Sequence, residues 1–295
     1  MPSLSPPYRG RFAPSPTGPL HFGSLVAACA SYLDARAHDG QWLLRIDDLD
    51  QTRVRPGADN AILTTLERFG FRWDEEPIRQ SDRTARYRWA LARLTGQGLV
   101  YACNCSRKRI REAGLAGVEG PRYPGYCRTR GLADDGKVAL RVAVPEETCC
   151  VEDAIQGRLC QALATDVGDF VVRRADGYFA YQLAVVMDDA DQGINHVIRG
   201  ADLFLSTPRQ VWLQRRLGVA TPRYAHVPLA RDAHGRKLSK QDMARPVDAG
   251  DPLPALRAAS DFLGQPPAVR SAPDLDAFWR RAIDHWSLDS VPATS

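Results

Sequence analysis

The chain has 295 residues, of which 44% are hydrophobic, so it can bury a sizeable core and hold two or three structural units. Lysine and arginine number 39 against 35 acidic residues, and a net charge of +4 does not by itself indicate a nucleic-acid-binding protein. Residues 1–7 form no apolar segment and no run of about eighteen apolar residues occurs, which argues against secretion and membrane spanning and leads us to expect a cytoplasmic protein.

Strands and helices are predicted to alternate along the first part of the chain. A strand over residues 9–13 precedes a loop rich in proline and glycine, and an apolar-periodic helix follows over residues 22–37. A second strand is predicted over residues 42–46, followed by a helix that ends near Gly70. This order indicates an α/β protein with a doubly wound, Rossmann-type parallel sheet.

The α/β pattern is interrupted between about residues 101 and 130, where cysteines, glycines, prolines and a basic run indicate an inserted module. Beyond it, strands are predicted over residues 180–187, 196–198 and 224–227, and a helix over residues 208–217. Past residue 247 the alanine-rich sequence predicts a small helical region. We therefore expect a nucleotide-binding domain in two halves, over residues 8–100 and 178–247. An inserted module would lie between them over residues 101–177, and a helical C-terminal region would cover residues 248–295.

The loop before the first predicted helix has the features of a phosphate-binding turn. Residues 14–24 read Pro-Ser-Pro-Thr-Gly-Pro-Leu-His-Phe-Gly-Ser, and they lie where a helix presents unpaired backbone N–H groups. Gly23 permits close approach of a ligand, Ser24 can cap or donate, and His21 can donate to a phosphate oxygen. A tight turn with a capping histidine would use the same residues, so this segment alone does not distinguish a phosphate site from a purely structural turn.

A second candidate phosphate site lies in the loop that contains residues 236–240, Arg-Lys-Leu-Ser-Lys. Lys237 and Lys240 could stabilise the charge that develops as pyrophosphate leaves ATP, although an exposed basic loop is the alternative. In a doubly wound sheet, this loop and the His21 turn would both lie at the carboxyl ends of strands around one crevice. Their joint occurrence therefore favours a nucleotide site.

These segments resemble the signatures of the class I aminoacyl-tRNA synthetases. Residues 21–24 are similar to the His-Ile-Gly-His motif of that class, and residues 237–241 to its Lys-Met-Ser-Lys-Ser loop. The sequence Arg-Phe-Ala-Pro-Ser-Pro-Thr-Gly at residues 11–18 resembles the opening of the glutamyl- and glutaminyl-tRNA synthetases. The similarity covers about residues 9 to 245 and includes residues 44–48, 181–189 and 197–202.

Within that class, the chain is most similar to the truncated glutamyl-queuosine tRNA(Asp) synthetase family. About fifty residues follow the lysine loop, too few for the anticodon-binding portion of a glutamyl-tRNA synthetase. The resemblance implies ATP-dependent activation of L-glutamate and its transfer to the cyclopentene diol of queuosine in the anticodon of tRNA(Asp). We expect a monomer whose partners are ATP, L-glutamate and tRNA(Asp), with the anticodon loop docked where an ordinary synthetase places the acceptor end.

The same resemblance implies a glutamate site. Its residues would be Arg11, Phe12, Ala13, Pro14, Ser15, Asp47, Tyr181 and Arg199. Elementary chemistry agrees in part, because glutamate carries two carboxylates and one ammonium, which two arginines and one acid would pair with. Asp47 would be that acid, at a position where the family usually has glutamate, so its contact with the amine would be longer or bridged by water.

An ATP site is implied next to it, with His21, Lys237 and Lys240 as the catalytic residues. Gly23, Ser24 and Ser239 would complete the ATP site, and Mg²⁺ would accompany ATP, held mainly by its phosphates. The glutamate carboxylate that attacks the α-phosphorus is ionised at neutral pH. The reaction therefore needs positioning and charge neutralisation and no general base.

The cysteines point to a metal site. Seven is an odd number, which fits reduced thiols better than a disulfide framework, and we expect Cys29, Cys149, Cys150 and Cys160 to be plain thiols. Three further cysteines lie in the inserted module, where the resemblance implies a zinc site formed by Cys103, Cys105, Tyr123 and Cys127. Three reduced thiols in a loop are the alternative.

Near these cysteines, a basic run could contact the phosphates of tRNA or form an exposed helix face; it consists of Arg107, Lys108, Arg109 and Arg111.

Three other functions fit part of these features. The chain could be the catalytic portion of a glutamyl-tRNA synthetase that charges tRNA(Glu) with a separate anticodon-binding partner. It could also be a small-molecule adenylyltransferase with the same nucleotide-binding fold, which would not depend on RNA. A catalytically silent RNA-binding module is the third, and glutamate-dependent exchange between ATP and pyrophosphate would exclude it.

Overall fold

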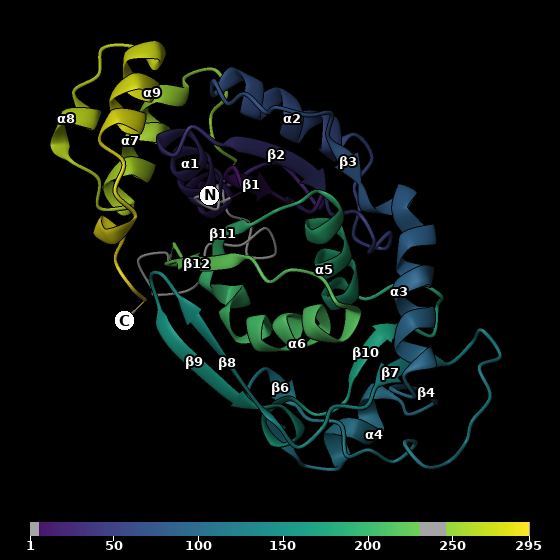
Figure 1. Cartoon of the computed structure of the whole chain (residues 1–295). Helices are drawn as coiled ribbons and strands as arrows, with labels where there is room; N and C mark the ends of the chain where they lie inside the picture. Colours follow the sequence, from purple (N-terminus) through teal and green to yellow (C-terminus); the bar gives the residue numbers. More distant parts are fainter. Residues whose placement is uncertain (1–5, 231–245, 295) are drawn as a thin grey trace.

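A layer of parallel strands forms the centre of the molecule (Figure 1). The computed structural model describes residues 6–230 and 246–294. One sheet has the order β1-β2-β3 and another the order β11-β12-β8-β9. The strands are β1 (Arg9–Phe12), β2 (Gln41–Ile46), β3 (Ile78–Arg79), β8 (Thr148–Asp153), β9 (Gly157–Ala162), β11 (His196–Gly200) and β12 (Arg223–Val227).

The two sheets meet where β1 lies beside β11. All pairs in the first sheet are parallel, as are β11 with β12 and β12 with β8, whereas β9 is antiparallel to β8. The backbone N–H of Asn195 donates to the carbonyl of Arg9 at 3.1 Å, and the backbone N–H of Arg9 donates to Asn195 Oδ1 at 2.8 Å. Strands from before and after the predicted insertion therefore share one layer, as an interrupted α/β pattern predicts.

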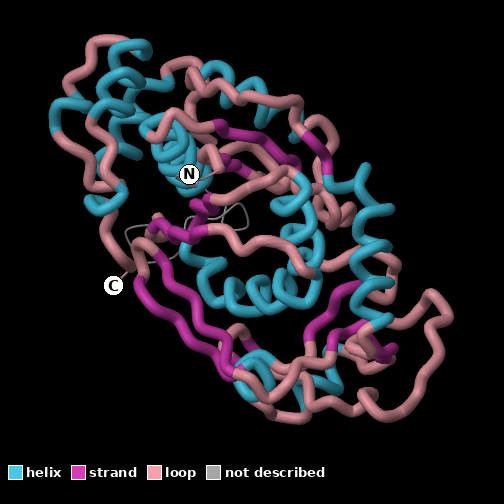
Figure 2. The backbone as a smooth tube through the Cα atoms, in the orientation of Figure 1, coloured by secondary structure: helices cyan, strands magenta, loops and turns pink. Residues whose placement is uncertain are grey.

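Helices cover both faces of this layer (Figure 2). On β2, Trp42 and Leu44 belong to one hydrophobic core and Leu43 to the other. The first core includes side chains from α1 (Phe22–Ala37), α2 (Ala58–Arg68), α7 (Pro252–Phe262), α8 (Pro267–Arg270) and α9 (Leu275–Asp284). The second includes α3 (Thr84–Gly96), α5 (Tyr181–Asp191) and α6 (Thr207–Leu217). The predicted α/β fold with a parallel sheet is thus confirmed.

Shorter elements connect the two halves in the lower part of Figure 1. They are β4 (Val100–Cys103), α4 (Arg107–Glu112), β5 (Ala116–Gly117), β6 (Gly120–Pro121), β7 (Ala139–Val142) and β10 (Phe170–Arg173). Strands β10, β7 and β4 form an antiparallel sheet. Short 3₁₀ helices lie at Gln80–Arg83, Ala201–Ser206 and Leu288–Ser290, and a π-helical turn at Leu163–Val167. The domain boundaries stay predictions.

One predicted strand is wrong. Residues 180–187 do not form a strand, because Tyr181–Asp191 is the helix α5 and Ala180 precedes it as its N-cap. Seven consecutive residues of α5, from Leu183 to Asp189, are buried, so this helix has no exposed polar stripe to reveal a helical period. A short, continuous apolar run fits a buried strand and a buried helix equally well.

A second correction concerns the cysteines. Cys150 and Cys160 are joined in a disulfide with a Cα–Cα distance of 4.0 Å, so they are not plain thiols. They face each other across the antiparallel pair β8–β9, where the register makes them direct partners. Cys29 and Cys149 are free and buried, as predicted. Within the described residues, no helix is both long and apolar enough to cross a membrane.

Candidate functional site

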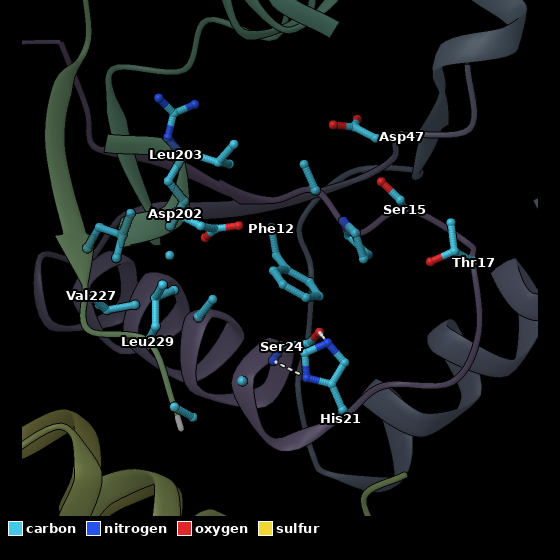
Figure 3. A pocket seen from close by; sticks show the side chains of 18 of the residues that line it. Phe12, Ser15, Thr17, His21, Ser24, Asp47, Asp202, Leu203, Val227 and Leu229 are labelled. Atoms are coloured by element: carbon cyan, nitrogen blue, oxygen red, sulfur yellow. Dashed lines mark hydrogen bonds between the residues drawn. The ribbon is translucent and has the colours of Figure 1, made fainter. Parts of the chain in front are cut away.

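The loop between β1 and α1 places His21 at the N-terminus of α1. Its Nδ1 accepts a hydrogen bond from the backbone N–H of Ser24 at 3.3 Å, and its Nε2 lies 3.0 Å from Ser24 Oγ (Figure 3). The first turn of α1 contains no acidic residue. No carboxylate within that turn offsets the positive end of the helix dipole, which suits an anion.

A cavity of about 450 Å³ opens beside this turn. Figure 3 shows Phe12, Ser15, Asp47 and His21 among the side chains that line it. All eleven residues predicted for the glutamate and ATP sites that lie in the described part of the chain line this cavity: Arg11, Phe12, Ala13, Pro14, Ser15, His21, Gly23, Ser24, Asp47, Tyr181 and Arg199. They come from β1, the loop after it, α1, the end of β2, α5 and β11, so the fold gathers residues that are widely spaced in sequence.

The predicted loop residues Lys237, Ser239 and Lys240 lie outside the described residues. The described residues on either side of this loop are both near the His21 turn. Ala230 lines the cavity, and Pro246 forms an isolated antiparallel bridge with His21.

Two buried arginines, of which Arg11 lines the cavity, share one carboxylate. Arg11 on β1 is 3% exposed, and its Nε lies 3.2 Å from Asp189 Oδ1. Arg45 on β2 is fully buried, and its Nη1 donates to the same oxygen at 2.6 Å. Burial alone would raise the pKa of Asp189, but Arg11 and Arg45 hold it below its ordinary value. These charges thus compensate one another inside the protein.

Asp47 is tied into the same network. Arg45 Nε donates to Asp47 Oδ1 at 2.7 Å. Burial raises the pKa of Asp47 to about 6, although the nearby guanidinium of Arg45 acts in the opposite direction. The carboxylate lines the cavity and is mostly ionised at neutral pH, so it can accept a cationic group (Figure 3).

Arg199 on β11 is also buried but has uncharged partners. Its Nε donates to His226 Nε2 at 2.9 Å and its Nη1 to Tyr181 Oη at 3.4 Å. Its Nη2 donates to Thr207 Oγ1 at 3.1 Å and to Gln210 Oε1 at 2.8 Å. Among the described residues, no carboxylate forms an ion pair with this guanidinium. Its positive charge is therefore available to a ligand in the cavity.

The predicted metal-ligand set gathers in space. The sulfur atoms of Cys103, Cys105 and Cys127 lie within 4.8 Å of one another, and those of Cys105 and Cys127 are 3.6 Å apart. Tyr123 Oη lies 3.3 Å from Cys103 Sγ and 3.7 Å from Cys105 Sγ. A zinc–sulfur bond of about 2.3 Å gives a tetrahedron with edges of roughly 3.8 Å, so the spacing fits such an ion.

The thiol of Cys127 is also prepared for metal binding. Burial would raise its pKa, but hydrogen bonding with Tyr123 and Asn104 lowers it to about 7. The backbone N–H of Cys127 donates to Tyr123 Oη at 2.8 Å, and the guanidinium carbon of Arg141 lies 4.0 Å from the centre of the Tyr123 ring. Burial and hydrogen bonding with the three cysteines nevertheless raise the pKa of Tyr123, so its phenol would have to lose a proton when a metal binds.

Sequence reasoning did not identify Arg45, Asp189 or His226 as parts of the site. A charged Arg45 inside an otherwise apolar strand could have indicated a buried ion pair, because arginine is rarely buried without a partner. Asp189 lay close to the segment that was wrongly predicted as a strand. Nothing in the sequence around His226 distinguishes it from any other strand residue.

The sequence matches the family model for the catalytic domain of class I tRNA synthetases (E and Q) over residues 8–252. A glutamyl-Q tRNA(Asp) synthetase of Burkholderia cenocepacia is 56% identical over 291 residues, which cover 96% of this chain and 97% of the relative. Another, from Aromatoleum aromaticum, is 52% identical over 289 residues, which cover 98% of this chain and 91% of the relative.

The fold is similar to solved structures as well. A crystal structure of a glutamate tRNA ligase from Elizabethkingia meningosepticum in complex with its amino acid superposes with a TM-score of 0.80 at 26% identity. The match covers 98% of this chain and 67% of that one.

Proposed function

The chain belongs to the class I tRNA synthetase family of glutamyl and glutaminyl enzymes, and on that premise we propose that it transfers L-glutamate to queuosine in the anticodon of tRNA(Asp), using ATP. Relatives that carry this activity in their names are 52% to 56% identical over almost the whole chain. The observation that carries the proposal is the convergence of eleven residues on one cavity of about 450 Å³. A volume of this size suits a small-molecule substrate.

The charges around the cavity support glutamate binding. The α-carboxylate has to react with ATP near the His21 turn and loses its charge when it does. A fixed cation therefore suits the side-chain carboxylate, which does not react, and Arg199 is the buried cation without a carboxylate partner among the described residues. Asp47 would accept the ammonium group, while Arg11 lines the cavity with its charge paired to Asp189.

ATP would bind at the first turn of α1 with His21, Gly23 and Ser24, and Mg²⁺ would be held mainly by its phosphates. An oxygen of the α-carboxylate attacks the α-phosphorus, the bond from that phosphorus to pyrophosphate breaks, and glutamyl-adenylate forms. Lys237 and Lys240 would stabilise the charge on the departing pyrophosphate. A hydroxyl of the queuosine diol then attacks the carbonyl carbon, an ester forms and AMP leaves.

A zinc ion would be held by Cys103, Cys105, Tyr123 and Cys127, where it would staple a small module whose apolar cluster is built around these same residues. We expect close to one zinc per chain in the purified protein, measured by mass spectrometry of the metal. The variant Cys127→Ser should lose that zinc, whereas Cys29→Ser, which changes a buried thiol elsewhere, should keep it. Equal zinc contents in the two variants would contradict the site.

The decisive experiment measures transfer of labelled glutamate to purified tRNA. Label should appear on tRNA(Asp) that contains queuosine and not on the same tRNA without the modification, which lacks the diol. Transfer to tRNA(Glu) in place of tRNA(Asp) would overturn the proposal and favour the catalytic portion of a glutamyl-tRNA synthetase. Glutamate-dependent exchange between ATP and pyrophosphate, run with and without tRNA, measures the first step separately.

A further inference from the structure

His226 is the direct neighbour of Arg199 in the sheet. The two residues are register partners on the parallel strands β11 and β12. His226 is fully buried, and its Nε2 accepts the hydrogen bond from Arg199 Nε at 2.9 Å. A guanidinium can only donate, so this nitrogen of the imidazole carries no hydrogen.

The other ring nitrogen of His226 faces a carboxylate. Its Nδ1 lies 2.5 Å from Asp153 Oδ2, and since Nε2 is an acceptor, Nδ1 carries the hydrogen and donates it. Burial lowers the pKa of His226 to about 4, so the ring is neutral at neutral pH. Asp153 therefore fixes the tautomer whose lone pair points at Arg199.

The charge of Asp153 is kept away from Arg199. Its Oδ1 accepts hydrogen bonds from the backbone N–H groups of His226, Ile155 and Gln156 at 3.0, 3.1 and 2.9 Å. Together with the imidazole N–H, these donors satisfy the carboxylate at the end of β8. The neutral ring then separates this anion from the guanidinium.

We propose that His226, oriented by Asp153, is a positioning residue that holds the guanidinium of Arg199 at the cavity with its charge uncompensated, and thereby determines selection of glutamate over glutamine. This inference rests on the proposed function. A carboxylate at position 226 would neutralise Arg199, and a protonated imidazole would repel it. A neutral acceptor supplies orientation without either effect.

Two substitutions at this position separate the two contacts of the ring. In His226→Asn the amide lies where Nδ1 was, so it keeps a donor for Asp153 and loses the acceptor for Arg199. In His226→Gln the amide reaches the former position of Nε2 and restores an acceptor. We expect His226→Asn to raise the KM for glutamate by about tenfold to a hundredfold, with kcat and the KM for ATP changed much less.

The same measurements distinguish a positioning role of His226 from a purely structural one. His226→Gln should recover most of the glutamate KM, and the ratio of kcat/KM for glutamate to that for glutamine should fall in the Asn variant and return in the Gln variant. An unchanged ratio, or an equal rise in the KM for ATP, would overturn the proposal. His196→Gln is the matched control, because His196 is half-buried on β11 and does not line the cavity.

Asp153→Asn gives a second measurement if the Asn variant does not fold. An amide at position 153 can donate to Nδ1, which favours the opposite tautomer and turns an N–H toward Arg199. The glutamate KM should rise here too, and no rise would contradict the role of Asp153. Wild-type protein that fails to transfer glutamate to tRNA(Asp) would defeat the proposed function, whereas active wild type with unaffected variants would defeat only this inference.

Discussion

The buried arginines in the cavity wall and directly behind it fall into two groups, which differ in the charge of their partners. Arg11 and Arg45 share the carboxylate of Asp189, and Arg45 also binds Asp47. Arg199 is buried to a similar extent but is held by neutral acceptors. The first group resembles a structural ion network, whereas the second leaves a positive charge for a ligand.

The difference has an energetic reason. A buried cation with a carboxylate partner is compensated in the empty protein, and removing either partner leaves an uncompensated charge. A buried cation among neutral acceptors is held in place but regains full compensation only when an anion binds. The first arrangement should therefore matter most for stability and the second for substrate binding.

The largest expected effect on stability is that of Asp189→Asn. The substitution leaves Arg11 and Arg45 without their shared carboxylate, so the free energy of unfolding should fall by about 3–5 kcal/mol. Urea denaturation at neutral pH measures it. Asp191→Asn is the control on the same helix, because Asp191 is partly exposed and pairs with Arg83 and Arg86, and its loss should be about 1 kcal/mol or less. Equal losses of unfolding free energy in the two variants would contradict a special structural role of the buried ion network.

Substitution of Arg199 should affect glutamate binding more than stability, the opposite of the effect expected for Asp189→Asn. Arg199→Gln removes a buried charge whose described partners are neutral, so stability should change by less than in Asp189→Asn. The kcat/KM for glutamate should fall by about a thousandfold, which corresponds to about 4 kcal/mol. Arg223→Gln, at the exposed start of β12, should leave kcat/KM nearly unchanged. A stable protein with unchanged glutamate kinetics after Arg199→Gln would show that this charge is not used for binding.

A smaller effect is expected from pH. With a pKa raised to about 6, Asp47 is protonated below pH 6 and loses the charge that would attract the ammonium group. The KM for glutamate should therefore rise by up to about tenfold per unit as the pH falls below 6. In Asp47→Asn the KM should be high and nearly independent of pH over this range. An unchanged wild-type KM between pH 7 and pH 5 would exclude Asp47 from amine binding.

The local pattern of the sequence was sufficient for much of the fold. The helix over residues 22–37 coincides with α1, and the strands predicted at β1, β2, β11 and β12 are present. Amphipathic or alternating segments reveal their structure because one face contacts the core and the other does not. The error at α5 has the same origin, since a helix buried on most sides has no such asymmetry.

The sequence by itself determined eleven of the residues that line the cavity, because the motifs around His21, Asp47, Tyr181 and Arg199 resemble a known family. Only the tertiary structure decided which of the charged side chains in and behind the cavity wall are paired with an opposite charge. Arg11 and Asp189 are 178 positions apart in the sequence, and His226 and Asp153 are 73 apart. Many residues with the same separations are not in contact. Local periodicity carries no information on such pairs, whereas burial in a shared interior decides which of them compensate each other.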